Sequence, residues 1–384
     1  MTKLIAVSQS RRNFLKTAAI GSFLGLNFSS LLSFGIPQSL VTSKANDSWW
    51  KVINNQTYGA KADDQGFIGG GKDYTRVVKT GNYIVKNFNQ LQEALKIAKR
   101  GDVIFIPGDI HIDLTTYIYI DKLVLLIPAG VTLASDRGHA GSEGALITSD
   151  SLDTPVIFKT RGKGVRFTGL RIQGPNSKRY LEHHKESFSK GGRGREYYYK
   201  FPVSRGIITE FSELEVDNCD ISAFSSSAIF LQKGNGHCIH HNIIHKCQYN
   251  GLGYGVSHDR ATSIIEYNLF NENRHSLAGT GNVGCGYIAR NNIELGISLS
   301  HCFDMHGGRD RKDGTSIAGT RIEIYNNTFL PDMNCVRVRG IPEDACLVYN
   351  NWFVHQLDPG KAVMGYEKTK SYNNLYGENP IKAT

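Results

Sequence analysis

The stretch Ile322-Glu323-Ile324-Tyr325-Asn326-Asn327-Thr328-Phe329 alternates apolar and polar residues up to an asparagine and continues beyond it. The same arrangement occurs in Ile264-Ile265-Glu266-Tyr267-Asn268-Leu269-Phe270. Alternation with a period of two places successive side chains on opposite faces of a strand. An asparagine between two such runs predicts a sharp bend, because this residue tolerates the left-handed backbone conformation. The stretch therefore predicts two short strands joined by a bend.

Asparagines of this kind recur through the second half of the chain with separations of 24, 26, 24, 35, 24 and 23 residues: Asn218, Asn242, Asn268, Asn292, Asn327, Asn351 and Asn374. A regular period in this range predicts a solenoid, in which each repeat buries its apolar face against its neighbours. Each repeat continues through a loop to a third short apolar stretch, such as Phe303–Met305. We therefore expect coils of three short strands, with asparagine amides bonding from coil to coil.

The repeat resembles the right-handed parallel β-helix of the pectin-lyase-like superfamily, over most of the chain. The resemblance implies an all-β, single-stranded solenoid with an N-terminal capping helix that covers its first coil. The sequence Phe88–Ala98 fits such a helix, because Asn89 and Gln92 form a capping-box pattern and an apolar stripe follows at helical spacing. We expect this helix at about residues 89–100.

The N-terminal sequence predicts an export signal. Ser10-Arg11-Arg12-Asn13-Phe14-Leu15-Lys16 precedes a moderately apolar run, which is typical of twin-arginine signals. Gly, Ser and Asn interrupt that run, and Ser43-Lys44-Ala45 offers a small-residue cleavage site. We therefore expect residues 1–45 to be removed, leaving a β-helix domain over 46–384. That domain would be periplasmic or secreted, with no stable membrane anchor.

Charge is concentrated in one insertion. The chain has 44 Lys and Arg against 35 Asp and Glu, and the predicted signal contains five of the basic residues and none of the acidic ones. Residues 176–203 have seven basic residues against three acidic ones, together with Tyr197-Tyr198-Tyr199. Such a segment is either a clamp for an acidic polymer or solvated surface. Nucleic acid is a less suitable partner, because no recognisable nucleic-acid-binding module is present.

The seven cysteines are Cys219, Cys238, Cys247, Cys285, Cys302, Cys335 and Cys346. Their number is odd, and no pair has the short spacing of a zinc site. We expect buried free thiols that act as small apolar residues.

Polar residues gather at the third strands. If Phe303 and Met305 point inward, then Asp304 and His306 point outward. Neighbouring coils lie about 4.8 Å apart, so residues of adjacent repeats share one surface. The expected patch contains Asp304, His306, Arg337, Arg339, Arg274, His275, Tyr254 and His258. The structural alternative is a set of ordinary salt bridges between coils, with histidines that are merely exposed.

The resemblance favours a polysaccharide lyase that cleaves a uronate-containing acidic polysaccharide by β-elimination. Arg337 and Arg339 would neutralise the uronate carboxylate, and Arg274 and His258 would also bind substrate. His306, oriented by Asp304, is the expected base, with His275 as the other choice. Tyr254 or the second histidine would protonate the leaving oxygen. No cofactor is expected, since Asp310 and Asp313, flanked by basic residues, are a weak signal for calcium.

Three other functions remain open. Phe303-Asp304-Met305-His306 is similar to the Asp-Pro-His segment of alginate epimerases, which favours uronate C5-epimerisation. Glycoside hydrolysis needs two carboxyl groups across the bond, for which Asp304 with Asp310 or Asp313 would serve. A non-enzymatic polysaccharide-binding solenoid or adhesin is the last alternative, because a fold alone does not establish catalysis.

Overall fold

The computed structural model describes residues 49–248, 252–296, 298 and 300–377. The predicted export signal lies outside the described residues. Within them, no helix is long and apolar enough to cross a bilayer. Ser48–Thr384 form one compact unit.

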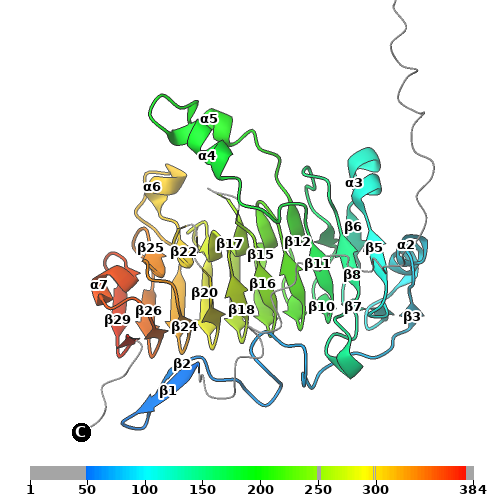
Figure 1. The fold of residues 1–384 in the computed structure, drawn as a ribbon, viewed down its shortest axis with the longest axis horizontal. Coiled ribbons are helices and arrows are strands. Elements are labelled where there is room, and N and C mark those ends of the chain that lie inside the picture. The colour runs from blue at the N-terminus through cyan, green and yellow to red at the C-terminus, as the bar shows by residue number, and fades with distance from the viewer. Residues whose placement is uncertain (1–48, 249–251, 297, 299, 378–384) are drawn as a thin grey trace, which may run out of the picture. The chain divides into compact units, whose positions relative to one another are not determined.

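The unit is a parallel β-helix whose coils stack side by side (Figure 1). Its first face contains β6 (Leu125–Ile127), β9 (Phe158–Thr160), β12 (Arg205–Thr209), the first part of β15 (Ser227–His240) and of β17 (Tyr254–Glu266), β19 (His275–Gly279), β22 (Phe303–Met305), β25 (Val336–Val338) and β28 (Val363–Met364). Every pairing on this face is parallel, as the repeat predicts.

The other two faces are built in the same way. The second contains β3 (Tyr83–Ile84), β4 (Val103–Phe105), β7 (Thr132–Ala134), β10 (Arg166–Thr168), β13 (Glu215–Asp217), the last part of β15 and β17, β20 (Gly286–Arg290), β23 (Arg321–Tyr325), β26 (Ala345–Tyr349) and β29 (Thr369–Tyr372). The third contains β5 (His111–Asp113), β8 (Leu146–Thr148), β11 (Arg171–Gln173), β14 (Asp220–Ser222), β16 (Ile243–His245), β18 (Leu269–Asn271), β21 (Ile293–Glu294), β24 (Thr328–Phe329), β27 (Trp352–Phe353) and β30 (Leu375–Tyr376). The expectation of three strands per coil is confirmed.

The core runs along the inside of the coils. Phe303, Met305, Val336 and Val338 are all buried there, so the predicted inward positions of β22 and β25 are confirmed. Six of the seven cysteines are also buried, Cys238 is half-buried, and all seven are free thiols, as expected.

The asparagine ladder has six members rather than seven. Side-chain amides bond from Asn242 through each successive coil to Asn374, at 3.0 Å per step. Asn218 is excluded, because Asp217 pairs with His240 and the residue opposite Asn242 is therefore Cys219. The left-handed residue of each bend precedes the ladder asparagine, as in Tyr267 before Asn268. The predicted left-handed asparagine was therefore wrong by one position, except at Asn218 itself, whose φ is +54°.

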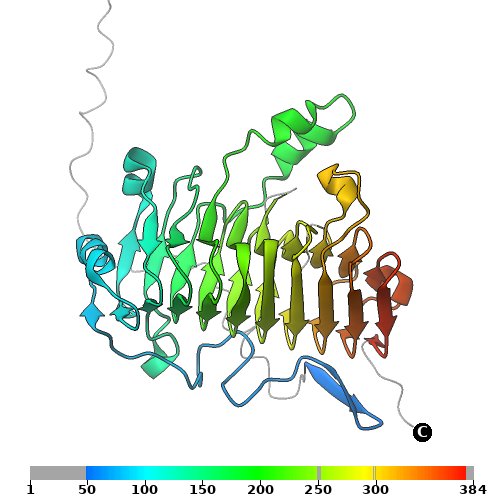
Figure 2. The same ribbon diagram turned by 180° about the vertical axis from the view of Figure 1, so that it is seen from behind.

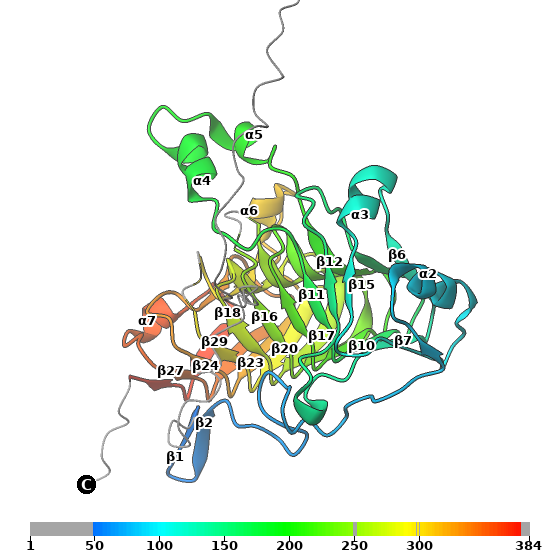
Figure 3. The same cartoon turned by 45° about the vertical axis from the view of Figure 1, so that its right-hand side comes forward.

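A capping helix is present, as predicted, but its cap is shifted. α2 (Phe88–Ile97) begins after Asn87, whose side chain accepts from the backbone N–H of Gln90 at 3.0 Å. The expected capping pair of Asn89 and Gln92 was therefore wrong by two residues. The expected apolar stripe is buried at the end of the solenoid (Figure 3).

Further helices project from the solenoid on one side. α3 (Thr115–Asp121), α4 (Leu181–Phe188), α5 (Gly194–Tyr198) and α6 (Gly308–Arg311) all stand on the upper side in Figures 1 and 2. Within the described residues, the remaining helical elements are the short turn η1 (His139–Gly141) and α7 (Pro359–Ala362). α4 and α5 form the basic insertion, which is therefore a helical hairpin and not a plain loop.

The N-terminal residues follow a different path. β1 (Trp50–Ile53) and β2 (Gln56–Gly59) form an antiparallel hairpin below the coils. Residues 60–76, here called the N-terminal strap, then run along the asparagine bends against the chain order of the coils. Gly69 donates its N–H to the carbonyl of Tyr267 at 2.8 Å, and Gly71 donates to Asn218 Oδ1 at 2.7 Å. The strap therefore covers the bends on the side opposite the projecting helices.

Candidate active site

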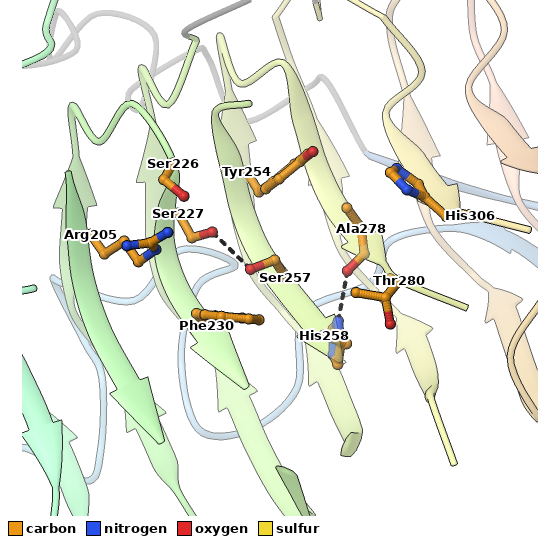
Figure 4. Close-up of a pocket in the computed structure, with 11 residues that line it drawn as sticks. Arg205, Ser226, Ser227, Phe230, Tyr254, Ser257, His258, Ala278, Thr280 and His306 are labelled. Atoms are coloured by element: carbon orange, nitrogen blue, oxygen red, sulfur yellow. Dashed lines mark hydrogen bonds between the residues drawn. The ribbon is translucent and has the colours of Figure 1, made fainter. Parts of the chain in front are cut away.

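A hollow of about 150 Å³ lies on the outer surface of the first face (Figure 4). Its lining comes from five consecutive coils: Arg205, Ser226, Ser227, Phe230, Tyr254, Ser257, His258, Ala278, Gly279, Thr280 and His306. Arg205 begins β12 and His306 follows β22, so the hollow runs along the axis of the solenoid. Its lining contains no carboxylate group.

His306 lies at one end of this hollow, beside a buried aspartate. Its Nε2 is 3.1 Å from Oδ2 of Asp304, whose side chain is fully buried although it points away from the core. Arg339 contacts the same carboxylate with two nitrogens, at 2.5 Å and 3.1 Å. Arg339 also donates to Asp310 at 3.0 Å. Asp304, His306 and Arg339 are therefore brought together, as the sequence predicts.

The carboxyl group of Asp304 keeps its negative charge in this environment. Burial opposes ionisation, but the imidazoles of His275 and His306 and the guanidinium of Arg339 outweigh it. They hold the pKa of Asp304 below its usual range. Nε2 of His306 and Oδ2 of Asp304 do not meet the geometry of a hydrogen bond, but the negative charge stabilises the imidazolium once it forms.

His275 is present in the same cluster but has no access to solvent. Its Nδ1 contacts the carbonyl of His301, and its Nε2 lies 3.7 Å from Asp304 Oδ2. Its ring is stacked between Tyr254 on one side and His301 on the other, at centroid distances of 5.7 and 5.5 Å. Burial lowers the pKa of His275, and the negative charge of Asp304 opposes this shift. This position fits a residue that orients its neighbours.

The side chains of Tyr254 and Arg274 lie close together next to His275. The Arg274 guanidinium lies 5.8 Å from the centroid of the Tyr254 ring. Burial raises the pKa of Tyr254, which keeps the phenol protonated at neutral pH. Burial and the nearby Arg274 charge lower the pKa of His184 in α4, which places the insertion close to this part of the site.

The insertion uses its own aromatic rings to hold its cations. Arg193 lies 3.9 Å from the centroid of Tyr197, and Arg195 lies 5.2 Å from that of Tyr199. Tyr197 also donates to Glu186 at 2.8 Å. These contacts order the hairpin internally.

The expectation that His258 faces outward is wrong. The strand register places it in line with Leu231 and, on the following coils, with Gly279 and Met305, which belongs to the core. The side chain is buried, and both ring nitrogens are occupied, by the carbonyl of Ala278 at 3.0 Å and by the hydroxyl of Ser263 at 2.8 Å. Burial lowers the pKa of His258 to about 4. These contacts fit a residue that braces the coil.

The two expected carboxylate-binding arginines differ from each other. Arg339 is already bound to Asp304 and Asp310. Arg337, in contrast, contacts the sulfur of Met364 at 3.0 Å and forms no ion pair with any described residue. Arg337 is therefore the one of the pair with a guanidinium available to an anionic ligand.

Two residues of the site were missed by the sequence patterns. His301 stacks on His275, and burial lowers its pKa to about 4. It precedes Phe303 by two residues, as His275 precedes Leu277, so comparison of the repeats would have identified it. Arg205 lies three coils before His275 in the same column of the first face, at the end of the basic insertion, where no repeat signal marks it.

The carboxylate groups that could bind a metal ion already form ion pairs with arginines. Asp310 pairs with Arg339, and Asp313 pairs with Arg311 at 2.7 Å. On the second face, ligand atoms of Glu215, Asp217 and His240 lie within 4.8 Å of one another. Arginines occupy both carboxylates there: Arg166 binds Asp217 with two nitrogens at 2.7 Å, and Arg76 binds Glu215 at 2.7 Å. This second group holds the N-terminal strap.

Comparison with known proteins gives weak likenesses. No family model matches the sequence, and no curated protein matches it. The alginate lyase of Paenibacillus sp. strain FPU-7 is 14% identical over 77% of this chain and 98% of that chain, with a TM-score of 0.43. The Family 28 exopolygalacturonase of Yersinia enterocolitica is 12% identical over 80% of this chain and 65% of that chain, with a TM-score of 0.42.

Proposed function

We propose that this protein is an exported lyase that cleaves a uronate-containing acidic polysaccharide by β-elimination. The observation that carries the proposal is a partly exposed imidazole, His306, set against the buried carboxylate of Asp304 at one end of a hollow without acidic lining. Export through the predicted twin-arginine signal is part of the same proposal.

His306 is the proposed base for the proton at C5 of the uronate. Its Nε2 faces Asp304, so Nδ1 accepts the proton while the carboxylate stabilises the imidazolium. Positioned bases of this kind contribute rate factors of about 10² to 10⁴. His275 is buried, so we assign it a positioning role through its contact with Asp304.

The charge that develops on the uronate carboxylate needs cationic neighbours. Arg337 and Arg274 form no ion pair with any described residue, and both belong to coils that contribute to the site. Guanidinium groups bind carboxylates in bidentate geometry, which makes these two the proposed ligands. The protonated phenol of Tyr254, in the lining of the hollow, is the proposed donor to the leaving glycosidic oxygen.

Uronate C5-epimerisation is the second candidate, because it begins with the same proton abstraction and His306 and Tyr254 offer two proton-transfer groups on one hollow. Glycoside hydrolysis is less well supported. It needs two carboxyl groups at the scissile bond, whereas Asp304 and Asp310 are both bound to Arg339.

The deciding experiment incubates the mature protein with alginate, pectate, glucuronan and glycosaminoglycans and follows the ultraviolet absorbance of unsaturated uronate. We expect absorbance to rise with one of these polymers and to fall by about 10²-fold or more in His306→Ala. His111→Ala, an exposed histidine on β5, is the matched control and should retain full activity. Exchange of the C5 proton without new absorbance would identify an epimerase instead, and full activity in His306→Ala would refute the assigned base.

A further inference from the structure

Arg205, like Arg274 and Arg337, forms no ion pair with an acidic side chain of the described residues. Arg166, Arg171, Arg290, Arg311 and Arg321 each form an ion pair with an aspartate or glutamate. Among the described residues, the hydrogen bond of the Arg205 side chain goes to the carbonyl of Pro155, at 3.3 Å. One neutral acceptor leaves most of the five N–H donors of a guanidinium available.

The surroundings of Arg205 select for an anion. The side chain is half-buried at the end of the hollow opposite His306, and the lining between them contains no carboxylate (Figure 4). Burial removes part of the water around the guanidinium and lowers the pKa of Arg205, yet arginine remains protonated in proteins. A partly desolvated cation without a counterion favours an anionic ligand over water.

The floor of the hollow beside Arg205 suits a sugar chain. Ser227 and Ser257 present hydroxyl groups 2.8 Å apart, and the ring of Phe230 lies next to them (Figure 4). Hydroxyl groups exchange hydrogen bonds with sugar hydroxyls, and an aromatic ring packs against the apolar face of a pyranose. The three residues belong to the coils that follow Arg205 and lead toward His306.

We propose that Arg205 forms a second carboxylate subsite, which binds a uronate unit of the same polymer several sugars away from the unit at His306. This inference rests on the proposed function. β12 and β22 are four coils apart, so the two ends of the hollow are separated by about 19 Å. The polymer would lie along the axis of the solenoid, with a negative charge required at both ends. A substrate with only one acidic unit would not use both subsites.

The test uses the mature protein and a length series of oligouronates prepared from the polymer that it cleaves. Arg205→Gln should raise KM by about 10-fold or more for oligomers long enough to reach both ends, and leave kcat unchanged. For the shortest oligomer that is cleaved, KM should stay at the wild-type value. Arg205→Lys, which keeps the charge, should recover part of the affinity for long oligomers and guards against a folding defect in Arg205→Gln.

Arg161→Gln is the matched control, because Arg161 is exposed on the turn after β9 and is not part of the lining. It makes the same change in net charge and should leave KM unchanged at every length. A rise in KM that is equal for short and long oligomers, or equal in Arg205→Gln and Arg161→Gln, would overturn the subsite.

Calorimetric titration of alginate, pectate, glucuronan and glycosaminoglycans into His306→Ala separates this inference from the proposed reaction. If one of them binds and Arg205→Gln weakens that binding, the subsite stands even when the wild-type protein produces no unsaturated uronate. If the wild-type protein cleaves a polymer and Arg205→Gln changes neither binding nor KM, the subsite is refuted and the lyase stands. Absence of both binding and cleavage would refute both.

Discussion

At the scale of single residues, the candidate site depends on outward side chains that are nevertheless buried. Asp304 points away from the core, but Arg339, His306 and His275 enclose it. A buried carboxylate is tolerated only when its neighbours supply compensating charge and hydrogen bonds. Removing one of those neighbours would therefore disturb the charge of the whole group rather than a single contact.

Glu294 is buried like Asp304 and Asp217, but no cation among the described residues pairs with it. Its register neighbours on the third face are Phe270 and Phe329, both in the core. Among the described residues, neither carboxyl oxygen meets the geometry of a hydrogen bond, although the Ser276 hydroxyl lies close enough to act on the group. Burial raises the pKa of Glu294 to about 8, against the opposing effect of the Ser276 hydroxyl. The group is therefore neutral in the folded protein at pH 7.

The raised pKa of Glu294 predicts that the folded protein loses stability as the pH rises toward 8. The folded pKa lies above the unfolded value, so the unfolded state releases its proton first and the free energy of unfolding falls as pH rises from about 4.5 to 8. Glu294→Gln removes the ionisable proton. At about 1.4 kcal/mol per pKa unit, it should stabilise the protein by about 2 to 4 kcal/mol at pH 8.5 and change little at pH 5. Urea unfolding at both pH values checks this, and an equal effect at the two would contradict it.

At the scale of elements, the asparagine ladder joins the coils along one line. Asn292 donates to the carbonyl of Ile265 at 2.8 Å and to Asn327 at 3.0 Å, and it accepts from both nitrogens of Asn268. Each interior asparagine thus satisfies backbone and side-chain groups on two neighbouring coils. Loss of one amide leaves several buried polar groups without partners.

Asn292→Ala should therefore lower the free energy of unfolding by about 2 to 4 kcal/mol, since each orphaned buried group costs about 1 to 3 kcal/mol. Asn374→Ala is the matched control at the last, half-buried position of the ladder. Asn374 bonds to only one neighbouring coil, so the substitution removes fewer hydrogen bonds. It should cost less than about 1.5 kcal/mol. Thermal or urea unfolding measures both variants, and equal costs would show that the ladder is not the source of the stability.

At the scale of the whole molecule, the N-terminal strap ties distant coils together through charges. Glu215 binds Arg76 of the strap at 2.7 Å, and Asp217 accepts from Tyr74 at 2.8 Å. Burial opposes ionisation of Glu215, but His240, Arg166 and Arg76 lower its pKa to about 2. The ionised network is thus part of what holds the strap on the bends.

This predicts a pH dependence opposite in sign to that of Glu294. A folded pKa below the unfolded value gives stability that is present above about pH 4.5 and is lost as pH falls toward 2. Glu215→Gln should cost about 2 kcal/mol at pH 7 and should flatten the fall in stability between pH 4.5 and 2. Measuring the free energy of unfolding at a series of acidic pH values tests this. If the free energy falls equally steeply in Glu215→Gln and in the wild-type protein, Glu215 is not the cause of the acid sensitivity.

The architecture follows from patterns in the amino-acid sequence alone. The repeat of Asn268, Asn292 and its relatives, with two-residue alternation on either side, specified three strands per coil and most of the ladder. These are local patterns, and each coil repeats the same solution, so a period in the sequence becomes a stack in space. Errors of one or two residues arose at Asn218 and at the cap of α2, because neighbouring asparagines compete for the same role.

Which outward residues keep functional groups available to a ligand depends instead on tertiary contacts. In the sequence, Arg337 and Arg339 are both predicted to point outward from the same coil. In the structure, α6 brings Asp310 into contact with Arg339 and not with Arg337. Alternation after Val256 already indicated that His258 points inward, whereas Arg205 became visible as a site residue only beside the hollow. Ion pairing and burial depend on the loops that return over a coil, and loop paths are not periodic, so no repeat in the sequence encodes them.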